Sequence, residues 1–291
     1  MCRLLGIVAS ELTEFGLVLT EAPRCLAKLS QEHRDGWGLA IHNTEPAGPV
    51  GADDPPWTLH RGIEPALDDR RFHEVAAGSR GRVLVAHVRQ KTVGPTRLEN
   101  THPFVRDGWA FAHNGTITGQ DLLRSRCSAR RLGEITGDTD SELFFAYVLT
   151  RFDECGVTRR ADPTALLEEM TAELRAARIG AFNFLLSDGE TTFAHRCGRS
   201  LFLLERGPDD PVRERRSLIP GAEVMTKWTA RRRAVFIASE AITDEPWREV
   251  PDGTLLRVDR SPTPAVTHGS LQPSRESSSD ATSVEGGRLA G

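Results

Sequence analysis

The chain has 291 residues, of which 27% are charged, and a formal net charge of −4 at pH 7. This length suffices for one large or two ordinary domains with a sizeable core. The weakly acidic balance argues against a nucleic-acid-binding surface. No apolar run approaches the roughly 18 residues of a membrane span, and the N-terminus lacks the pattern of a signal peptide. We therefore expect a cytoplasmic protein with no nucleic-acid and no membrane partner.

The cysteines and histidines give no metal or disulfide pattern. The five cysteines are odd in number and scattered over the chain, at Cys2, Cys25, Cys127, Cys155 and Cys197. The nine histidines are dispersed, with no HExxH spacing. A GxxxxGK[ST] phosphate loop and a GxSxG elbow are both missing from the sequence. We expect no metal and no cofactor.

Strand signals dominate the first half of the chain. Apolar or β-branched runs predict strands at 4–9, 36–42, 57–61, 82–88 and 109–113. A loop rich in Pro, Gly and Asp is expected at 44–56. The dipeptide Asn114-Gly115, which favours a tight turn, is expected to close the fifth strand.

Helices follow, and then further strands. Thr139 and Glu142 match the capping box that starts a helix, and an apolar stretch at 143–149 comes next. Asp162 and Pro163 mark the start of a second helix, with Leu166, Leu167, Met170 and Leu174 at helical spacing. Further strands are expected at 181–187, 191–195, 201–204 and 234–239, with a hairpin turn at 187–190. This order predicts an α+β layered domain over residues 1–260. Residues 261–291, rich in Ser, Thr, Pro and Gly, are expected to form a disordered tail.

Cys2 is the first candidate catalytic residue. Removal of Met1 ahead of this small residue would place a thiol and a free α-amino group on one residue. An α-amine with a pKa of about 7.7–8.0 is partly unprotonated near neutrality. Such an amine can activate a thiol, which is nucleophilic only as thiolate. The alternative is that a cysteine at position 2 has no function.

Four polar clusters, at the ends of predicted strands or helices, are candidates for a functional site. Arg89 follows a predicted strand and could hold a carboxylate through two parallel hydrogen bonds, or form a surface ion pair. Asn114 and Gly115 supply a side-chain amide and a backbone N–H that could form an oxyanion hole, or only a turn. Asp140 lies in the first turn of a predicted helix and could pair with a ligand ammonium group, or only cap the helix. His102 lies in a rigid Asn-Thr-His-Pro cluster and could be catalytic or a core histidine.

Cys2, Arg89, Asn114-Gly115 and Asp140, in this order, resemble the class II glutamine amidotransferases, which are N-terminal-nucleophile hydrolases. The similarity is greatest to the stand-alone, YafJ-like branch. Six motifs behind Cys2 carry it, and they span the chain to about residue 258: Arg-Asp-Gly-Trp-Gly (34–38), Ala-His-Val-Arg-Gln (86–90), Glu-Asn-Thr-His-Pro-Phe (99–104), Ala-His-Asn-Gly (112–115), Gly-Asp-Thr-Asp-Ser-Glu (137–142) and Phe-Asn-Phe-Leu-Leu-Ser-Asp-Gly (182–189).

The resemblance implies a four-layer αββα sandwich and assigns roles to individual residues. Cys2 would attack the side-chain amide of glutamine, with its own α-amine as general base. Asn114 and Gly115 would stabilise the oxyanion. Arg89 would bind the α-carboxylate of the substrate and Asp140 its α-ammonium group. Two further positions, Thr92 and His102, match residues that shape the pocket.

The resemblance also implies a γ-glutamyl thioester on Cys2 that water hydrolyses to glutamate. The ammonia would pass to a separate synthase subunit, or the enzyme would hydrolyse γ-glutamyl amides without transfer. The family contains hydrolases of γ-glutamyl intermediates in ergothioneine synthesis and in glutathione breakdown. Two other interpretations stay open: a catalytically inactive module of the same fold that binds an amino acid or regulates a partner, and an unrelated scaffold with a buried cysteine.

Overall fold

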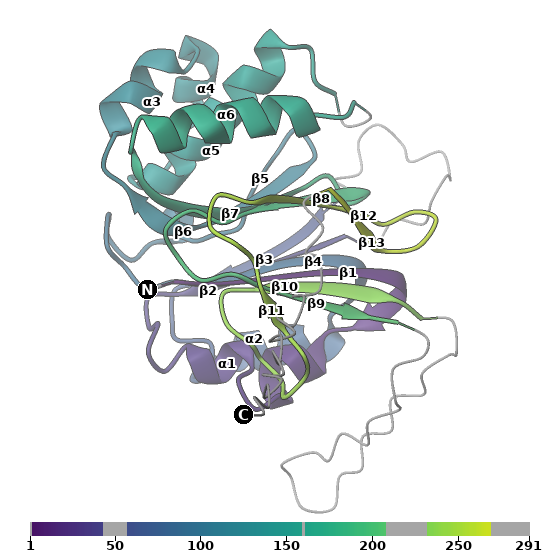
Figure 1. Ribbon diagram of the computed structural model, residues 1–291. Coiled ribbons are helices and arrows are strands. Elements are labelled where there is room, and N and C mark those ends of the chain that lie inside the picture. The colour runs from purple at the N-terminus through teal and green to yellow at the C-terminus, as the bar shows by residue number, and fades with distance from the viewer. Residues whose placement is uncertain (1, 43–56, 159–160, 208–231, 269–291) are drawn as a thin grey trace, which may run out of the picture.

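The computed structural model describes residues 2–42, 57–158, 161–207 and 232–268. In this part of the chain two antiparallel β-sheets lie face to face, and helices cover the outer face of each sheet (Figure 1). The four-layer αββα sandwich expected from the resemblance is thereby confirmed.

The first sheet has seven strands in the order β11-β9-β10-β1-β4-β2-β3. β1 and β4 lie at its centre, and Arg3 of β1 is opposite Val88 of β4. The strands are β1 (Arg3–Glu14), β2 (Trp37–His42), β3 (Trp57–Gly62), β4 (Arg80–Val88), β9 (Phe202–Arg206), β10 (Ala234–Ala238) and β11 (Arg248–Glu249).

The second sheet has six strands in the order β13-β12-β8-β7-β6-β5. Its strands are β5 (Phe104–Arg106), β6 (Trp109–Ile117), β7 (Gly180–Ser187), β8 (Thr191–His195), β12 (Leu255–Asp259) and β13 (Ala265–His268). The predicted hairpin between β7 and β8 is confirmed, because the Asp188 N–H donates to the Thr191 carbonyl at 3.2 Å.

The helices divide between the two outer layers (Figure 1). The first sheet is covered by α1 (Leu26–Leu29), α2 (Arg70–Gly78) and a π-helical turn (Leu17–Glu21). Above the second sheet lie α3 (Gln120–Arg126), α4 (Ala129–Gly133), α5 (Asp140–Glu154) and α6 (Thr164–Ala176), and a 3-10 turn (Leu98–Asn100) precedes β5. Among the described residues, none of these helices combines the length and the apolar character needed to cross a membrane.

The start of α5 follows the predicted capping box. The Thr139 side chain accepts the Glu142 N–H at 3.3 Å, which satisfies one of the first unpaired N–H groups of the helix. The Glu142 carboxylate reaches further back than in a standard box, to the N–H groups of Thr136 and Gly137. It also pairs with Arg106 of β5, so the start of α5 is fixed to the second sheet.

The central strands bury both faces, because successive side chains alternate between a helix layer and the opposite sheet. In β1, Leu5 and Ile7 pack toward the helices, whereas Leu4 and Val8 pack into the core between the sheets. In β6, Phe111 packs toward the helices and Ala112 toward the first sheet. This alternation decides which polar residues at the strand ends can face one another.

The dipeptide Asn114-Gly115 does not form the expected turn. β6 continues to Ile117, and Asn114 is opposite Asn183 of β7. A Cβ atom on Gly115 would lie 1.9 Å from the Ala181 carbonyl oxygen, so only glycine lets the two strands approach this closely. The turn interpretation of this dipeptide is therefore wrong.

The expected disorder does not hold for the first part of the tail. β13 pairs with β12, with Val266 opposite Val258, and Val266 packs against the core between the sheets. His268 Nε2 lies 2.8 Å from a Glu168 carboxylate oxygen of α6. This short run, which contains β-branched residues, forms a strand because it pairs with β12 at the edge of the second sheet. Residues 269–291 of the predicted tail, and the whole of the predicted loop at 44–56, lie outside the described residues.

The aromatic core under α5 gives a stability prediction. Phe144 is fully buried and packs against Phe111, Phe182 and Phe184 at centroid distances of 5.5–5.8 Å. Phe144→Ala removes these contacts and leaves a cavity, so we expect the free energy of unfolding to fall by about 3–5 kcal/mol. Urea denaturation measures this loss. As a control, Leu98→Ala should change it by less than about 0.5 kcal/mol, because Leu98 is 43% exposed.

Candidate active site

The Cys2 thiol lies at the end of the first sheet, beside the turn that follows β4. Its Sγ is 3.3 Å from both the backbone N–H and the carbonyl oxygen of Gln90. Leu4, two residues later, points into the core between the sheets. Strand alternation places the Cys2 side chain on this same face, toward the second sheet.

Burial raises the pKa of the Cys2 thiol, although the Gln90 backbone hydrogen bond and the nearby Arg89 charge act in the opposite direction. A raised pKa leaves little thiolate near neutral pH. A group that accepts the thiol proton during the reaction is therefore needed if this cysteine is to act as a nucleophile.

Arg89 is a buried residue and not part of a surface ion pair. It directly follows β4 and is only 3% exposed, so the surface interpretation of this arginine is wrong. Its guanidinium donates to the carbonyl oxygens of Val93 at 2.9 Å and Pro95 at 3.1 Å. Burial lowers the pKa of Arg89, and the charges of Cys2, Asp35 and Asp140 counteract this effect. These groups are thus close enough to Arg89 to interact electrostatically.

The loop that holds Arg89 is itself anchored by Asp35. One Asp35 carboxylate oxygen accepts the Lys91 N–H at 2.8 Å, and the other accepts the Thr96 hydroxyl at 3.1 Å. Thr92, expected to shape the pocket, is an exposed residue of this loop. Asp35 belongs to the sequence motif at 34–38, but the sequence alone predicted no role for it.

Asn114 faces the first sheet and reaches its central strand through Ser239. Its Nδ2 donates to Ser239 Oγ at 3.3 Å, and the same oxygen accepts the Leu4 N–H at 2.9 Å. Through Ser239, the side chain of the predicted oxyanion donor Asn114 is linked to the backbone of Leu4, which follows Cys2 by two residues in the sequence. Ser239 was missed by sequence reasoning; its only signal was a polar residue at the end of a predicted strand.

Asp140 binds β6 and leaves the capping of α5 to Thr139. One Asp140 oxygen accepts the Ile117 N–H at 2.7 Å, and the residue is 4% exposed. The neighbouring Ser141 hydroxyl lies 2.8 Å from Nδ1 of His113. Pure helix capping is therefore the wrong interpretation of Asp140, whose carboxylate lies beside the strand that carries Asn114.

Asn100 connects the Arg89 loop to the segment before α5. Its Nδ2 donates to the Pro95 carbonyl at 2.9 Å, and its Oδ1 accepts the Asp138 N–H at 2.7 Å. The amide is fully buried and has a partner at each end. This residue, which sequence reasoning noted without a role, links the surroundings of Arg89 to those of Asp140.

His102 occupies an interior position. Its ring lies 4.3 Å from that of His87 and 4.7 Å from that of Phe104, centroid to centroid. Neither ring nitrogen of His102 has a hydrogen-bond partner among the described residues. Burial lowers its pKa well below the ordinary value, so the ring is neutral. The structure agrees with the alternative of a core histidine.

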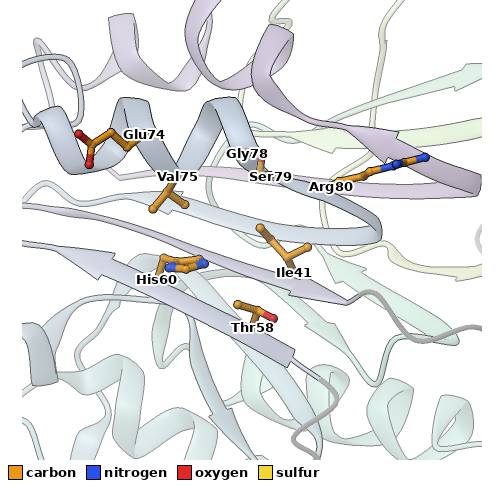
Figure 2. A pocket seen from close by; sticks show the side chains of 8 residues that line it. All are labelled: Ile41, Thr58, His60, Glu74, Val75, Gly78, Ser79 and Arg80. Carbon is orange, nitrogen blue, oxygen red and sulfur yellow. The ribbon is translucent and has the colours of Figure 1, made fainter.

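A pocket of about 270 Å³ lies elsewhere in the molecule, between α2 and the strands β2 and β3 (Figure 2). It is lined by Ile41, Thr58, His60, Glu74, Val75, Gly78, Ser79 and Arg80. Ile41 belongs to the core on the helix side of the first sheet. Cys2 faces the other side, so this sheet separates the pocket from the candidate active site.

Comparison with known proteins places this site in a family. A model of the class II glutamine amidotransferases matches residues 1–283, and the chain therefore belongs to this family. It is 28% identical to the putative glutamine amidotransferase YafJ of Escherichia coli, over 87% of this chain and 95% of that protein. It is also 28% identical to the γ-glutamyl-hercynylcysteine sulfoxide hydrolase of Mycobacterium tuberculosis, over 89% of this chain and 93% of that protein.

A solved structure agrees with this assignment at the level of the fold. A glutamine aminotransferase class-II domain protein from Silicibacter pomeroyi superposes with a TM-score of 0.55 at 19% identity, covering 92% of this chain and all of that one. The sandwich described above is thus the N-terminal-nucleophile hydrolase fold of the class II enzymes.

The Asp35 anchor gives a prediction about the Arg89 loop. Asp35→Ala removes both acceptors that hold Lys91 and Thr96, so we expect faster amide hydrogen exchange at residues 90–97. Hydrogen exchange followed by mass spectrometry measures this change. The matched control is Asp68→Ala, since Asp68 is an exposed carboxylate that pairs only with exposed Arg34 among the contacts seen. Unchanged exchange at 90–97 in Asp35→Ala would contradict the anchoring role.

Proposed function

We propose that the protein is a cysteine-dependent glutamine amidotransferase or γ-glutamyl amidohydrolase that releases glutamate from a γ-glutamyl amide. The observation that carries this proposal is that the Ser239 hydroxyl oxygen accepts hydrogen bonds from both the Leu4 N–H and the Asn114 side chain. Through it, the strand that follows Cys2 and the strand that carries Asn114 meet at one end of the space between the sheets. A nucleophile and an oxyanion donor need this proximity.

In the proposed reaction, the Cys2 α-amine takes the thiol proton and Sγ attacks the substrate's side-chain carbonyl carbon. Negative charge moves to the carbonyl oxygen, where Asn114 Nδ2 and the Gly115 N–H stabilise it. The protonated amine gives its proton to the leaving nitrogen, and the C–N bond breaks to leave a γ-glutamyl thioester. Water, deprotonated by the same amine, then attacks the thioester, and glutamate and the free thiol are formed.

Arg89 and Asp140 are proposed to hold the two charged groups of the glutamyl unit. The carbonyls of Val93, Gly94 and Pro95 occupy three of the five guanidinium N–H donors, which leaves two for an α-carboxylate. The Asp140 carboxylate would accept from the α-ammonium group. Thr92 would contribute to the pocket through the loop over Arg89. His102 would do so indirectly, through its packing against His87 of β4.

The fate of the ammonia or amine released from the γ-glutamyl amide is a separate part of the proposal. Similarity to a protein named as a γ-glutamyl-hercynylcysteine sulfoxide hydrolase favours direct hydrolysis of a γ-glutamyl compound. Similarity to a putative amidotransferase favours delivery of ammonia to a separate synthase subunit. Either activity is proposed to take place in the cytoplasm, because all five cysteines are free thiols.

The proposed nucleophile is tested by substitution and by the mass of the mature N-terminus. We expect Met1 to be removed and Cys2→Ala to abolish glutamate release from glutamine and γ-glutamyl peptides, with an unchanged unfolding midpoint. Cys155→Ala is the matched control, because Cys155 is also a free thiol but is exposed, and it should keep full activity. A mature protein that retains Met1 and releases glutamate at full rate would rule out the α-amine as base.

The proposed glutamyl clamp is tested with Arg89→Lys and Asp140→Asn. Lysine cannot reproduce the planar fork of arginine, and asparagine can still accept the Ile117 N–H but carries no charge. Asp140→Asn removes one charge of a buried pair, which costs about 2–5 kcal/mol. Arg89→Lys keeps the charge but loses the bidentate contact, and we expect a cost in the same range. We therefore expect kcat/KM to fall at least roughly 30-fold, equally for glutamine and for γ-glutamyl peptides.

The control for the clamp is Asp121→Asn, which removes an exposed carboxylate from the first turn of another helix and should leave kcat/KM unchanged. Losses confined to one leaving group would mean that Arg89 and Asp140 do not bind the glutamyl unit.

A further inference from the structure

We infer that Ser239 is a positioning residue that fixes the direction in which the Asn114 amide presents its N–H to the oxyanion. This inference rests on the proposed function, since it requires Asn114 to act as an oxyanion donor. It adds a residue outside the six motifs that carry the family resemblance.

Ser239 is rigidly held at the end of β10. It is 2% exposed, and its backbone N–H donates to the Leu4 carbonyl at 3.1 Å. Its own carbonyl accepts the Ser200 hydroxyl at 2.8 Å. With both backbone groups bonded, the position of the Ser239 side chain is determined by its neighbours and not by solvent.

The hydroxyl oxygen of Ser239 accepts two N–H donors. The Leu4 N–H occupies one acceptor position at 2.9 Å, and Asn114 Nδ2 occupies the other at 3.3 Å. A side-chain amide carries two hydrogens on a planar nitrogen. Because one of them is bound to Ser239, the direction of the second is fixed as well. That second N–H is the one that can meet the oxyanion.

The same hydroxyl oxygen also holds the strand that follows Cys2 next to the side chain of Asn114. Leu4 is two residues from Cys2, so one hydroxyl holds both the nucleophile's strand and the oxyanion donor's side chain. The adjacent Glu240 pairs with Arg3, which secures the start of β1 from the same segment. Donors that are already oriented stabilise a transition state without the cost of reorganisation.

The test compares Ser239→Ala in the wild-type and the Asn114→Ala backgrounds. In the wild-type background we expect kcat for glutamate release to fall about 10- to 100-fold, less than the 10²–10³ typical of removing a donor. KM should stay within about twofold, because the oxyanion forms only along the reaction path. In the Asn114→Ala background, Ser239→Ala should reduce kcat by no more than about twofold, since the group it orients is gone.

Ser30→Ala is the matched control, because Ser30 is also a buried serine whose hydroxyl accepts a backbone N–H, that of Leu67, and it is bonded to neither Ser239 nor Asn114 among the contacts seen. It should leave kcat near the wild-type value. If Ser239→Ala does not fold, the nearly isosteric Ser239→Cys replaces it, and the same fall in kcat at unchanged KM is expected because sulfur is a weak acceptor.

Two results would overturn the inference. The first is full kcat in the Ser239 variant. The second is an equal fold-loss in the two backgrounds, which would show that Ser239 acts independently of Asn114. Failure of the proposed function is distinguishable from both, since glutamate release would then survive Cys2→Ala.

Discussion

The face-to-face packing of two β-sheets is the constraint on which the candidate site depends. Side chains that alternate along β1 and β6 form a shared apolar core, and the polar residues at the strand ends continue the same alternation. Leu4 and Ala112 therefore pack in the core between the sheets, while Cys2 and Asn114 extend these two rows beyond it. At this end the Ser239 hydroxyl connects the two sheets. A change in register of either strand by one residue would turn its polar residue toward a helix layer.

Burial gives the site its electrostatic character. It raises the pKa of the Cys2 thiol and lowers the pKa of His87 to about 3, so the thiol is protonated and the nearby imidazole is neutral at physiological pH. The neutral His87 ring therefore does not compete with Arg89 for an anion. Because the buried thiol is protonated, the proposed mechanism needs a base, and the α-amine of Cys2 is the group that accepts the thiol proton. A low local dielectric also strengthens each hydrogen bond to the developing oxyanion.

The sequence predicted the elements with strong local signals and missed those that depend on tertiary contacts. The capping residue Thr139 and the hairpin after Ser187 were correct, because their hydrogen bonds are made within a few residues. The turn at Asn114-Gly115 was wrong, since pairing with β7 keeps this dipeptide in a strand. β13 was missed because a run of four residues forms a strand only where an open edge such as that of β12 is available. Ser239 could not be linked to Asn114 from sequence, as 125 positions separate them.

The most direct test of the proposed mechanism is the identification of the residue that becomes acylated during turnover. The wild-type protein would be mixed with a γ-glutamyl amide, quenched in acid within milliseconds and digested for mass spectrometry. The account predicts a glutamyl group on the N-terminal peptide, attached to the thiol of Cys2 and removed by hydroxylamine. A glutamyl group on any other residue, or glutamate formed with full retention of activity after Cys2 is blocked, would contradict it.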